Sequence, residues 1–191
     1  ASSSEPRAPA WIRAARLTLA MMSHAAPSMM AALPAYGLAE GEFWRHAVAS
    51  ALAVDLLQRR LATRIPSGAM TAAFLHDAGK LVLNPLMDEA RRAELARGAA
   101  SGRTVFPQVE LEILGFSHAA IGARVALHWN LGSAIAAAIR GHHELGAHQD
   151  PAIDAVRIAN LAAKTAGCGL GLEGMNLGAD AGACGRLGLS G

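Results

Sequence analysis

The sequence contains little cysteine, few aromatic residues and no long apolar run. Its two cysteines, Cys168 and Cys184, both lie in a glycine-rich tail and form no C-x-x-C motif. This argues against a thiolate zinc site and against a disulfide scaffold, and it fits a reduced, cytoplasmic setting. No apolar run reaches the roughly 18 residues that a membrane span needs, so we expect no membrane partner.

A strong excess of charge of either sign is also missing. Lys and Arg number 17 against 15 for Asp and Glu, which gives a formal net charge of +2. Such a balance gives no support for electrostatic binding of nucleic acid. Hydrophobic residues make up 52% of the chain, with Ala and Leu dominant and β-branched and aromatic residues few. This composition favours an all-α fold with a real core.

Proline, glycine and serine divide the chain into segments. We expect residues 1–9 to be a loose N-terminal segment, residues 10–167 a helical domain, and residues 168–191 a loosely ordered glycine-rich segment. Ser117 and Ser133 are predicted helix N-caps, and Gly79 is a predicted helix stop. The expected helices cover residues 10–22, 40–63, 68–79, 80–97 with an interruption at Asn84–Pro85, 106–114, 117–129, 133–142 and 151–165.

Several polar side chains share helix faces with apolar ones. Residues three, four and seven apart lie on one face of a helix, and this spacing aligns each polar residue with Ala, Ile, Val or Leu. Burying a polar group costs several kcal/mol unless it is paired. One such residue needs no special explanation, but several on different helices satisfy one another only by converging. These residues are His46, His76, Asp77, His118, His142 and Asn160.

A metal ion is the simplest centre for such a set. Imidazole and carboxylate ligands without thiolate suit iron or manganese, with zinc or nickel as alternatives, and argue against calcium. The number of candidate ligands suits two ions about 3.5–4 Å apart rather than one. His24, His128 and His148 lack an apolar context, and we expect them to be structural or exposed.

The same residues resemble the HD superfamily of metal-dependent phosphohydrolases. His46 matches the first histidine of its signature, and His76–Asp77 match the His-Asp pair. The segment HDAGK is similar to the H-D-x-G-K of the HD-GYP branch. That branch also matches Glu42, four residues before His46, and then His118 and the pair His142–His143.

A third branch, the HDOD (HD-related output) domains, is more similar still. The resemblance lies in EGEFWRHAVASALA, FLHDAGKLVL, EILGFSHAAIGARVALHWNL, IRGHHE and AVRIANLAAKTAGCGLG, in this order, and runs from about residue 10 to the end. It implies an HD-type multi-helix bundle with an internal metal site. It also implies that family helices are missing before this region, as in a fragment or a shortened member.

Two departures bear on activity. Asn160 occupies the position where HD hydrolases usually carry a last aspartate ligand, so the site has one negative charge fewer. The G-Y-P motif is absent after the histidine pair, where the sequence reads HHELGAHQD, and this puts cyclic di-GMP in doubt as a substrate.

The resemblance leaves two main functions open. In the first, Glu42, His46, His76, Asp77, His118, His142, His143 and Asn160 hold one or two divalent transition metals, Asp77 bridges them, and the site hydrolyses a nucleotide or other phosphoester. Lys80 then holds a phosphate oxygen or assists the leaving group, unless it is a solvated lysine at a helix end. In the second, the domain is a bacterial signalling or scaffold module with protein partners and a structural metal, or a nucleotide sensor without turnover. Homodimer formation is compatible with either.

Overall fold

The computed structural model describes residues 27–102, 105–144, 150–174 and 181–189. The expected loose segment 1–9 and helix 10–22 lie outside this range. Within it the elements are helical, apart from one isolated bridge between Leu33 and Leu38, and the all-α prediction is confirmed. The elements are η1 (Pro34–Tyr36), α2 (Glu42–Arg60), α3 (Gly68–Leu75), α4 (Ala78–Leu83), η2 (Asn84–Leu86), α5 (Glu89–Ala100), α6 (Phe106–Leu114), α7 (His118–His128), α8 (Ser133–Gly141), α9 (Pro151–Thr165) and α10 (Ala181–Leu187).

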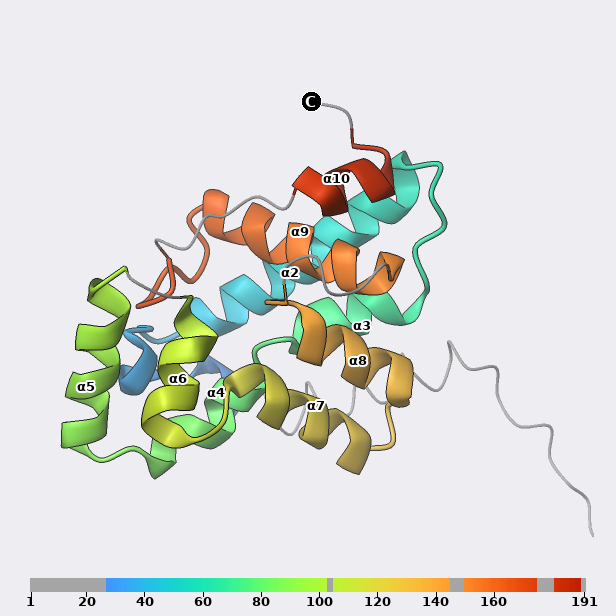
Figure 1. Ribbon diagram of the computed structural model, residues 1–191. Helices are drawn as coiled ribbons and strands as arrows, with labels where there is room; N and C mark the ends of the chain where they lie inside the picture. The colour runs from blue at the N-terminus through green and yellow to red at the C-terminus, as the bar shows by residue number, and fades with distance from the viewer. Residues whose placement is uncertain (1–26, 103–104, 145–149, 175–180, 190–191) are drawn as a thin grey trace, which may run out of the picture.

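The helices pack around one apolar core, which also encloses the predicted cluster of polar side chains. Helices α2, α3 and α9 pack on one another, and α8 joins them through α3 and α9. Helix α7 connects α8 to α4, while α5 and α6 form a separate pair at one end of the molecule (Figure 1). Alanines such as Ala69, Ala72 and Ala155 are fully buried, and these small side chains let the helices approach closely.

Several helix limits follow directly from local sequence signals. Helices α6 and α9 span the predicted residues 106–114 and 151–165. The side chain of Ser117 accepts a hydrogen bond from the Ala120 amide, as predicted for an N-cap. Ser133 is instead the first residue of α8, and Gly132 takes the N-cap position without a side-chain bond.

Gly79 does not end the FLHD helix. Helix α3 ends at Leu75, His76 and Asp77 form a turn, and Gly79 lies inside α4. Its role is close packing, because a β-carbon there would collide with the backbone carbonyl of His118 at the start of α7.

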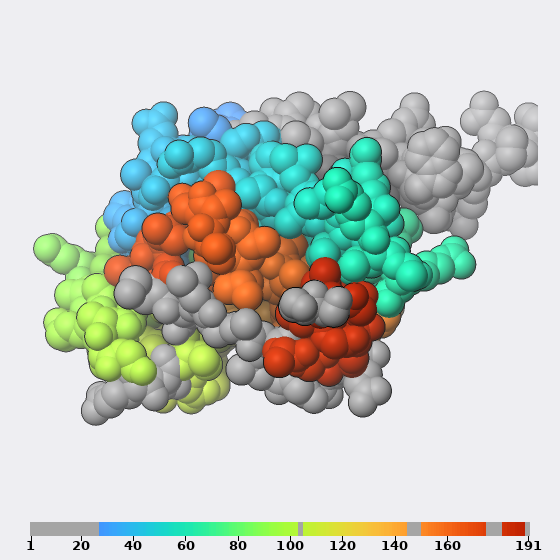
Figure 2. All heavy atoms as spheres, turned by 90° about the horizontal axis from the view of Figure 1, so that it is seen from above, coloured from blue at the N-terminus to red at the C-terminus, as the bar shows by residue number. Residues whose placement is uncertain are grey.

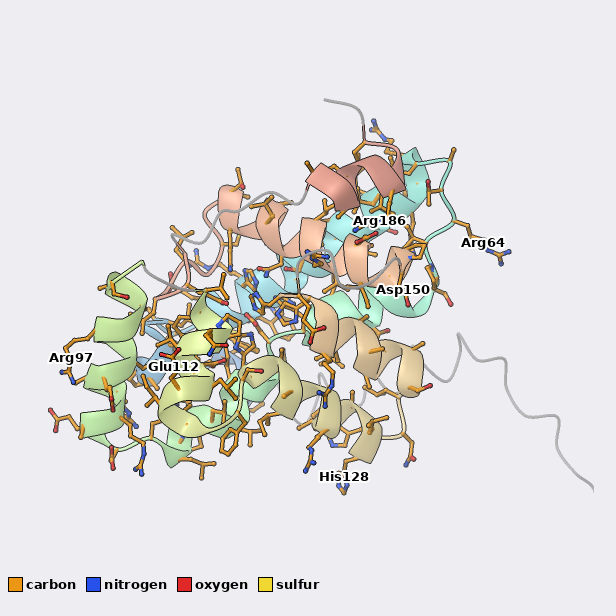
Figure 3. All side chains as sticks on the ribbon, viewed as in Figure 1. Arg64, Arg97, Glu112, His128, Asp150 and Arg186 are labelled. Carbon is orange, nitrogen blue, oxygen red and sulfur yellow. The ribbon has the colours of Figure 1, made fainter. Side chains whose placement is uncertain are left out.

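The glycine-rich segment also differs from the expectation of a loose tail, since most of its described residues pack on the domain. The Leu172 amide donates to the Tyr36 carbonyl at 2.8 Å, and Leu187 of α10 is buried. Helix α10 lies beside α9 and the segment that follows α2 (Figure 2). Figure 3 shows Arg186 on the side of α10 that faces α9, where it donates two hydrogen bonds to the buried Asp154 carboxylate.

Among the described residues, no helix is both long and apolar enough to cross a membrane.

Candidate metal centre

Four separate parts of the chain bring histidines and one aspartate to the same place. His46 comes from the second turn of α2, His76 and Asp77 from the turn between α3 and α4, and His118 from the first position of α7. The pair His142 and His143 follows the last residue of α8. All are buried except His143, whose side chain is 17% exposed. The predicted convergence of these side chains is therefore present in the fold.

Asp77 lies between two groups of histidines. Its Oδ2 is 3.7 Å from Nε2 of His46 and 3.6 Å from Nε2 of His76. Its Oδ1 is 3.3 Å from Nε2 of His118 and 3.9 Å from Nε2 of His142. The possible ligand atoms fall within 4.8 Å of one another in two groups, one of His46, His76 and Asp77 and one of Asp77, His118, His142 and His143. One carboxylate thus faces two candidate ion positions.

In four of these histidines, the ring nitrogen that faces away from the cluster, Nδ1, is hydrogen-bonded to another group of the protein. Each Nδ1 lies within hydrogen-bond distance of an acceptor oxygen, so it carries the proton and Nε2 is left with its lone pair toward the cluster in the neutral ring. Metal-binding histidines are usually oriented in this way. The acceptors for His46, His76, His118 and His142 in turn are the carbonyl of Cys168 at 3.0 Å, the carbonyl of Ala73 at 2.6 Å, the carboxylate of Glu110 at 2.6 Å and the carbonyl of Ile139 at 2.5 Å.

Burial and neighbouring charges separate the protonation states of these rings. Burial lowers the pKa of His76 to about 3 and also lowers the pKa values of His46 and His142, so these rings are neutral. Burial opposes the charged form of His118 as well, but the adjacent carboxylates of Glu110 and Asp77 together outweigh it and raise the pKa to about 9. Against the cost of burial, Lys80 holds the pKa of Asp77 well below its usual range.

The donor set fits a divalent transition metal. Asp77 Oδ1 and His142 Nε2 are buried and have no hydrogen-bond partner among the described residues. Two buried acceptor atoms that lie 3.9 Å apart with no hydrogen-bond donor are costly in a protein interior. A cation between them would satisfy both, and neutral imidazole with carboxylate suits iron, manganese, zinc or nickel.

One predicted ligand, Glu42, lies apart from the two groups. Glu42, 26% exposed, accepts a hydrogen bond from the Ala39 amide at 2.7 Å and lies 3.6 Å from Arg45, so it closes the turn before α2 and belongs to neither ligand group. Asn160 is buried on α9, and its Oδ1 accepts no hydrogen bond from the described part of the chain.

Lys80 is not the solvated helix-end residue that was the alternative. It is buried, and its Nζ donates to Asp77 Oδ2 at 2.8 Å and to Glu173 Oε2 at 2.6 Å. His128 lies on the outside of the molecule at the end of α7, as expected (Figure 3). His24 and His148 lie outside the described residues.

Sequence reasoning missed two buried carboxylates at the site. Glu110 shares a face of α6 with Phe106 and Ile113, so the spacing that identified the histidines would also have identified it. Glu173 follows the glycine-rich stretch after α9, where no helical period exists to predict burial.

Comparison with known proteins agrees with this geometry. The family model of the HDOD domain matches residues 14–145. Two crystal structures are similar: an HDOD domain protein with unknown function from Geobacter sulfurreducens (24% identity, TM-score 0.56) and a "Putative phosphohydrolase" from Shewanella amazonensis SB2B (25% identity, TM-score 0.57). Each match covers 66% of this chain, but only 43% and 47%, respectively, of those two chains. No curated protein matches. The match to the family model spans more than half of the sequence, and the chain belongs to the HDOD domain family.

Proposed function

We propose that this HDOD domain is a metal-dependent phosphohydrolase that acts on a nucleotide or another phosphoester. The observation that carries the proposal is the position of Asp77, whose two carboxylate oxygens face two separate histidine groups. Divalent ions held there would supply Lewis-acid chemistry, acidifying water and neutralising charge on a phosphoryl group. The described similarity to a structure named as a phosphohydrolase supports the same reaction class.

The chain's own residues have distinct tasks in this proposal. His46 and His76 on one side, and His118, His142 and His143 on the other, offer the ligand nitrogens. Asp77 joins the two groups. Lys80 supplies a fixed positive charge beside Asp77, in a place where it can hold a phosphoryl oxygen once Glu173 has moved away. Burial of the cluster excludes bulk water and strengthens each of these interactions.

Metal content tests the first step. We expect elemental analysis of protein purified without chelator to find one or two transition-metal ions per chain, with iron or manganese the first candidates. Anomalous scattering at the corresponding absorption edges would count the ions and identify them. A folded protein that contains no transition metal, and takes up none on dialysis, would remove the basis for the proposal.

Activity against a chromogenic aryl phosphodiester tests the second step. The double change His76→Ala and Asp77→Ala should abolish hydrolysis, because it removes ligands from both groups. His128→Ala changes an exposed histidine at the end of α7 and is the matched control. Hydrolysis that survives the double change would arise from another site or from a contaminant.

A non-catalytic signalling module is the second candidate function. It is favoured by the way Lys80 and Glu173 fill the edge of the cluster, since a structural or sensing site does not need access for substrate. Protein that retains its metal but hydrolyses no phosphoester would support this alternative.

A further inference from the structure

Two buried lysines from distant helices converge on one carboxylate. Nζ of Lys80, on α4, lies 2.6 Å from Oε2 of Glu173, and Nζ of Lys164, on α9, lies 3.6 Å from the same oxygen. All three residues are at most 5% exposed. Buried charges need opposite charges or hydrogen bonds as compensation, so this place in the fold requires an anion.

The Glu173 carboxylate also reaches the candidate metal centre. Its Oε1 is 3.1 Å from Nε2 of His143, which in turn is 3.1 Å from Nε2 of His118. Oε1 nevertheless accepts no hydrogen bond within the described residues. An anion therefore sits at the edge of the second histidine group with one oxygen directed at a ligand nitrogen.

Residues 168–174, which we call the plug, carry Glu173 over the site. The Cys168 carbonyl lies 3.0 Å from Nδ1 of His46. Gly169 and Gly171 have φ angles of +64° and +41°, which side chains rarely adopt. A β-carbon at Gly171 would lie 2.5 Å from the Tyr36 carbonyl oxygen. The plug thus depends on glycine to approach the site this closely.

We propose that the Glu173 carboxylate occupies the binding position of a phosphoryl oxyanion, and that the plug competes with an anionic ligand for Lys80 and Lys164. A phosphoryl group offers these ammonium groups the same anionic oxygens as the carboxylate. Two anions at this position would repel each other, so binding of the ligand expels the plug. The choice of a phosphoryl ligand rests on the function proposed above; the competition itself rests on the contacts of Glu173.

Binding of inorganic phosphate, measured by calorimetry on the protein as purified, tests the competition. Glu173→Gln removes the charge and keeps the shape of the side chain, and Gly171→Ala dislodges the plug without changing any charge. If the plug is closed in most molecules, the apparent affinity for phosphate falls in proportion to the fraction of molecules in which the plug is open. We expect both variants to bind phosphate at least about tenfold tighter than the wild type does.

Two matched variants control for charge and for backbone strain. Glu112→Gln removes an exposed carboxylate on α6. Gly102→Ala places alanine at a φ of +60° where nothing lies within 4 Å. Both should bind phosphate as the wild type does. Lys164→Met combined with Gly171→Ala should reverse the gain in phosphate affinity, because one of the two ammonium groups is lost.

Hydrogen exchange gives a readout that does not depend on turnover. The Leu172 amide donates to the Tyr36 carbonyl in the closed plug, so its exchange in the wild type should accelerate when phosphate is added.

The proposal is overturned if Glu173→Gln and Gly171→Ala bind phosphate no better than the wild type, or do not bind it. Loss of metal from Glu173→Gln alone also overturns it, since Glu173 would then be a metal ligand. If phosphate displaces the plug but the protein hydrolyses no phosphoester, the result would contradict the proposed function and still support the proposed competition.

Discussion

Glu110 accepts two hydrogen bonds from a single residue, His118: one from the backbone amide at 2.8 Å and one from the ring Nδ1 at 2.6 Å. Its other oxygen accepts from the Tyr36 hydroxyl at 2.8 Å. All three residues are buried and come from separate elements of the fold. The carboxylate therefore fixes the ring of His118 so that Nε2 faces Asp77.

Glu110→Gln should weaken metal binding without removing a ligand. The amide keeps the size of the side chain but loses the negative charge that makes Nε2 of His118 a stronger ligand for a metal ion. Changes to such supporting residues typically cost about 10- to 100-fold in metal affinity. Competition with a chelating dye would measure the loss, and Glu112→Gln, exposed and two residues away on α6, is the control. Equal metal affinity in Glu110→Gln and wild type would contradict an orienting role for Glu110.

Tyr36→Phe should lower the free energy of unfolding by about 1–3 kcal/mol, because it leaves a buried Glu110 oxygen without its donor. Urea unfolding would measure the change. Thr165→Val removes a hydroxyl that bonds to the Leu161 carbonyl at an exposed position. It should stay within about 0.5 kcal/mol of the wild type. A similar cost for both variants would mean that burial of the Tyr36 bond contributes nothing.

The residues that the sequence could predict are those on regular helices or directly at their ends. His46, His118 and His142 repeat with apolar neighbours at helical spacing, and this period alone indicates that they face the interior. Short-range signals also worked at Ser117, whose cap depends on three residues of local chain.

The failures have a common physical cause, which is tertiary contact. Gly79 carries the signal of a helix stop, but close approach of α4 and α7 uses the missing side chain instead. Glu42 lies one turn before His46, but its carboxylate accepts a hydrogen bond from the Ala39 amide at the start of α2 and is not directed to the cluster. Glu173 follows a glycine-rich segment whose sequence has no helical period that could predict burial. Its partners Lys80 and Lys164 are therefore identified only from the folded structure.

Gly79→Ala should destabilise the protein by about 3 kcal/mol, because the new methyl group meets backbone atoms that cannot move aside as a side chain would. Gly185→Ala is the matched control, since Gly185 is also helical but has nothing within 4 Å of its β-carbon position. That change should stabilise α10 by about 0.5–1 kcal/mol through helix propensity. Thermal unfolding of the two variants should therefore shift in opposite directions.

Arg186→Ala should detach α10 from α9. It removes two hydrogen bonds, of 2.7 and 2.8 Å, from Asp154, which is 1% exposed. Arg157, whose Nη1 is 3.8 Å from that carboxylate, compensates part of the charge. We therefore expect a loss of about 1–3 kcal/mol rather than the full cost of an unpaired buried ion.

The control for Arg186 is Arg59→Ala. Arg59 pairs with Asp55 on the exposed face of α2, and such surface pairs contribute about 0–1 kcal/mol. Denaturant unfolding should separate the two variants clearly. If Arg186→Ala costs no more than Arg59→Ala, the contact with Asp154 does not hold α10 in place.

The sharing of Asp77 between the two ligand groups predicts an unequal pattern of metal loss. Asp77→Asn removes the carboxylate that both groups share, so it should lower the occupancy of both ion positions. His46→Gln changes only the first group and His142→Gln only the second, so each should remove at most one ion per chain. Elemental analysis and anomalous maps of the three variants would separate these results. Loss of all metal from His46→Gln, with Asp77→Asn unaffected, would mean that Asp77 does not join two sites, and a single ion would have to be placed among the histidines alone.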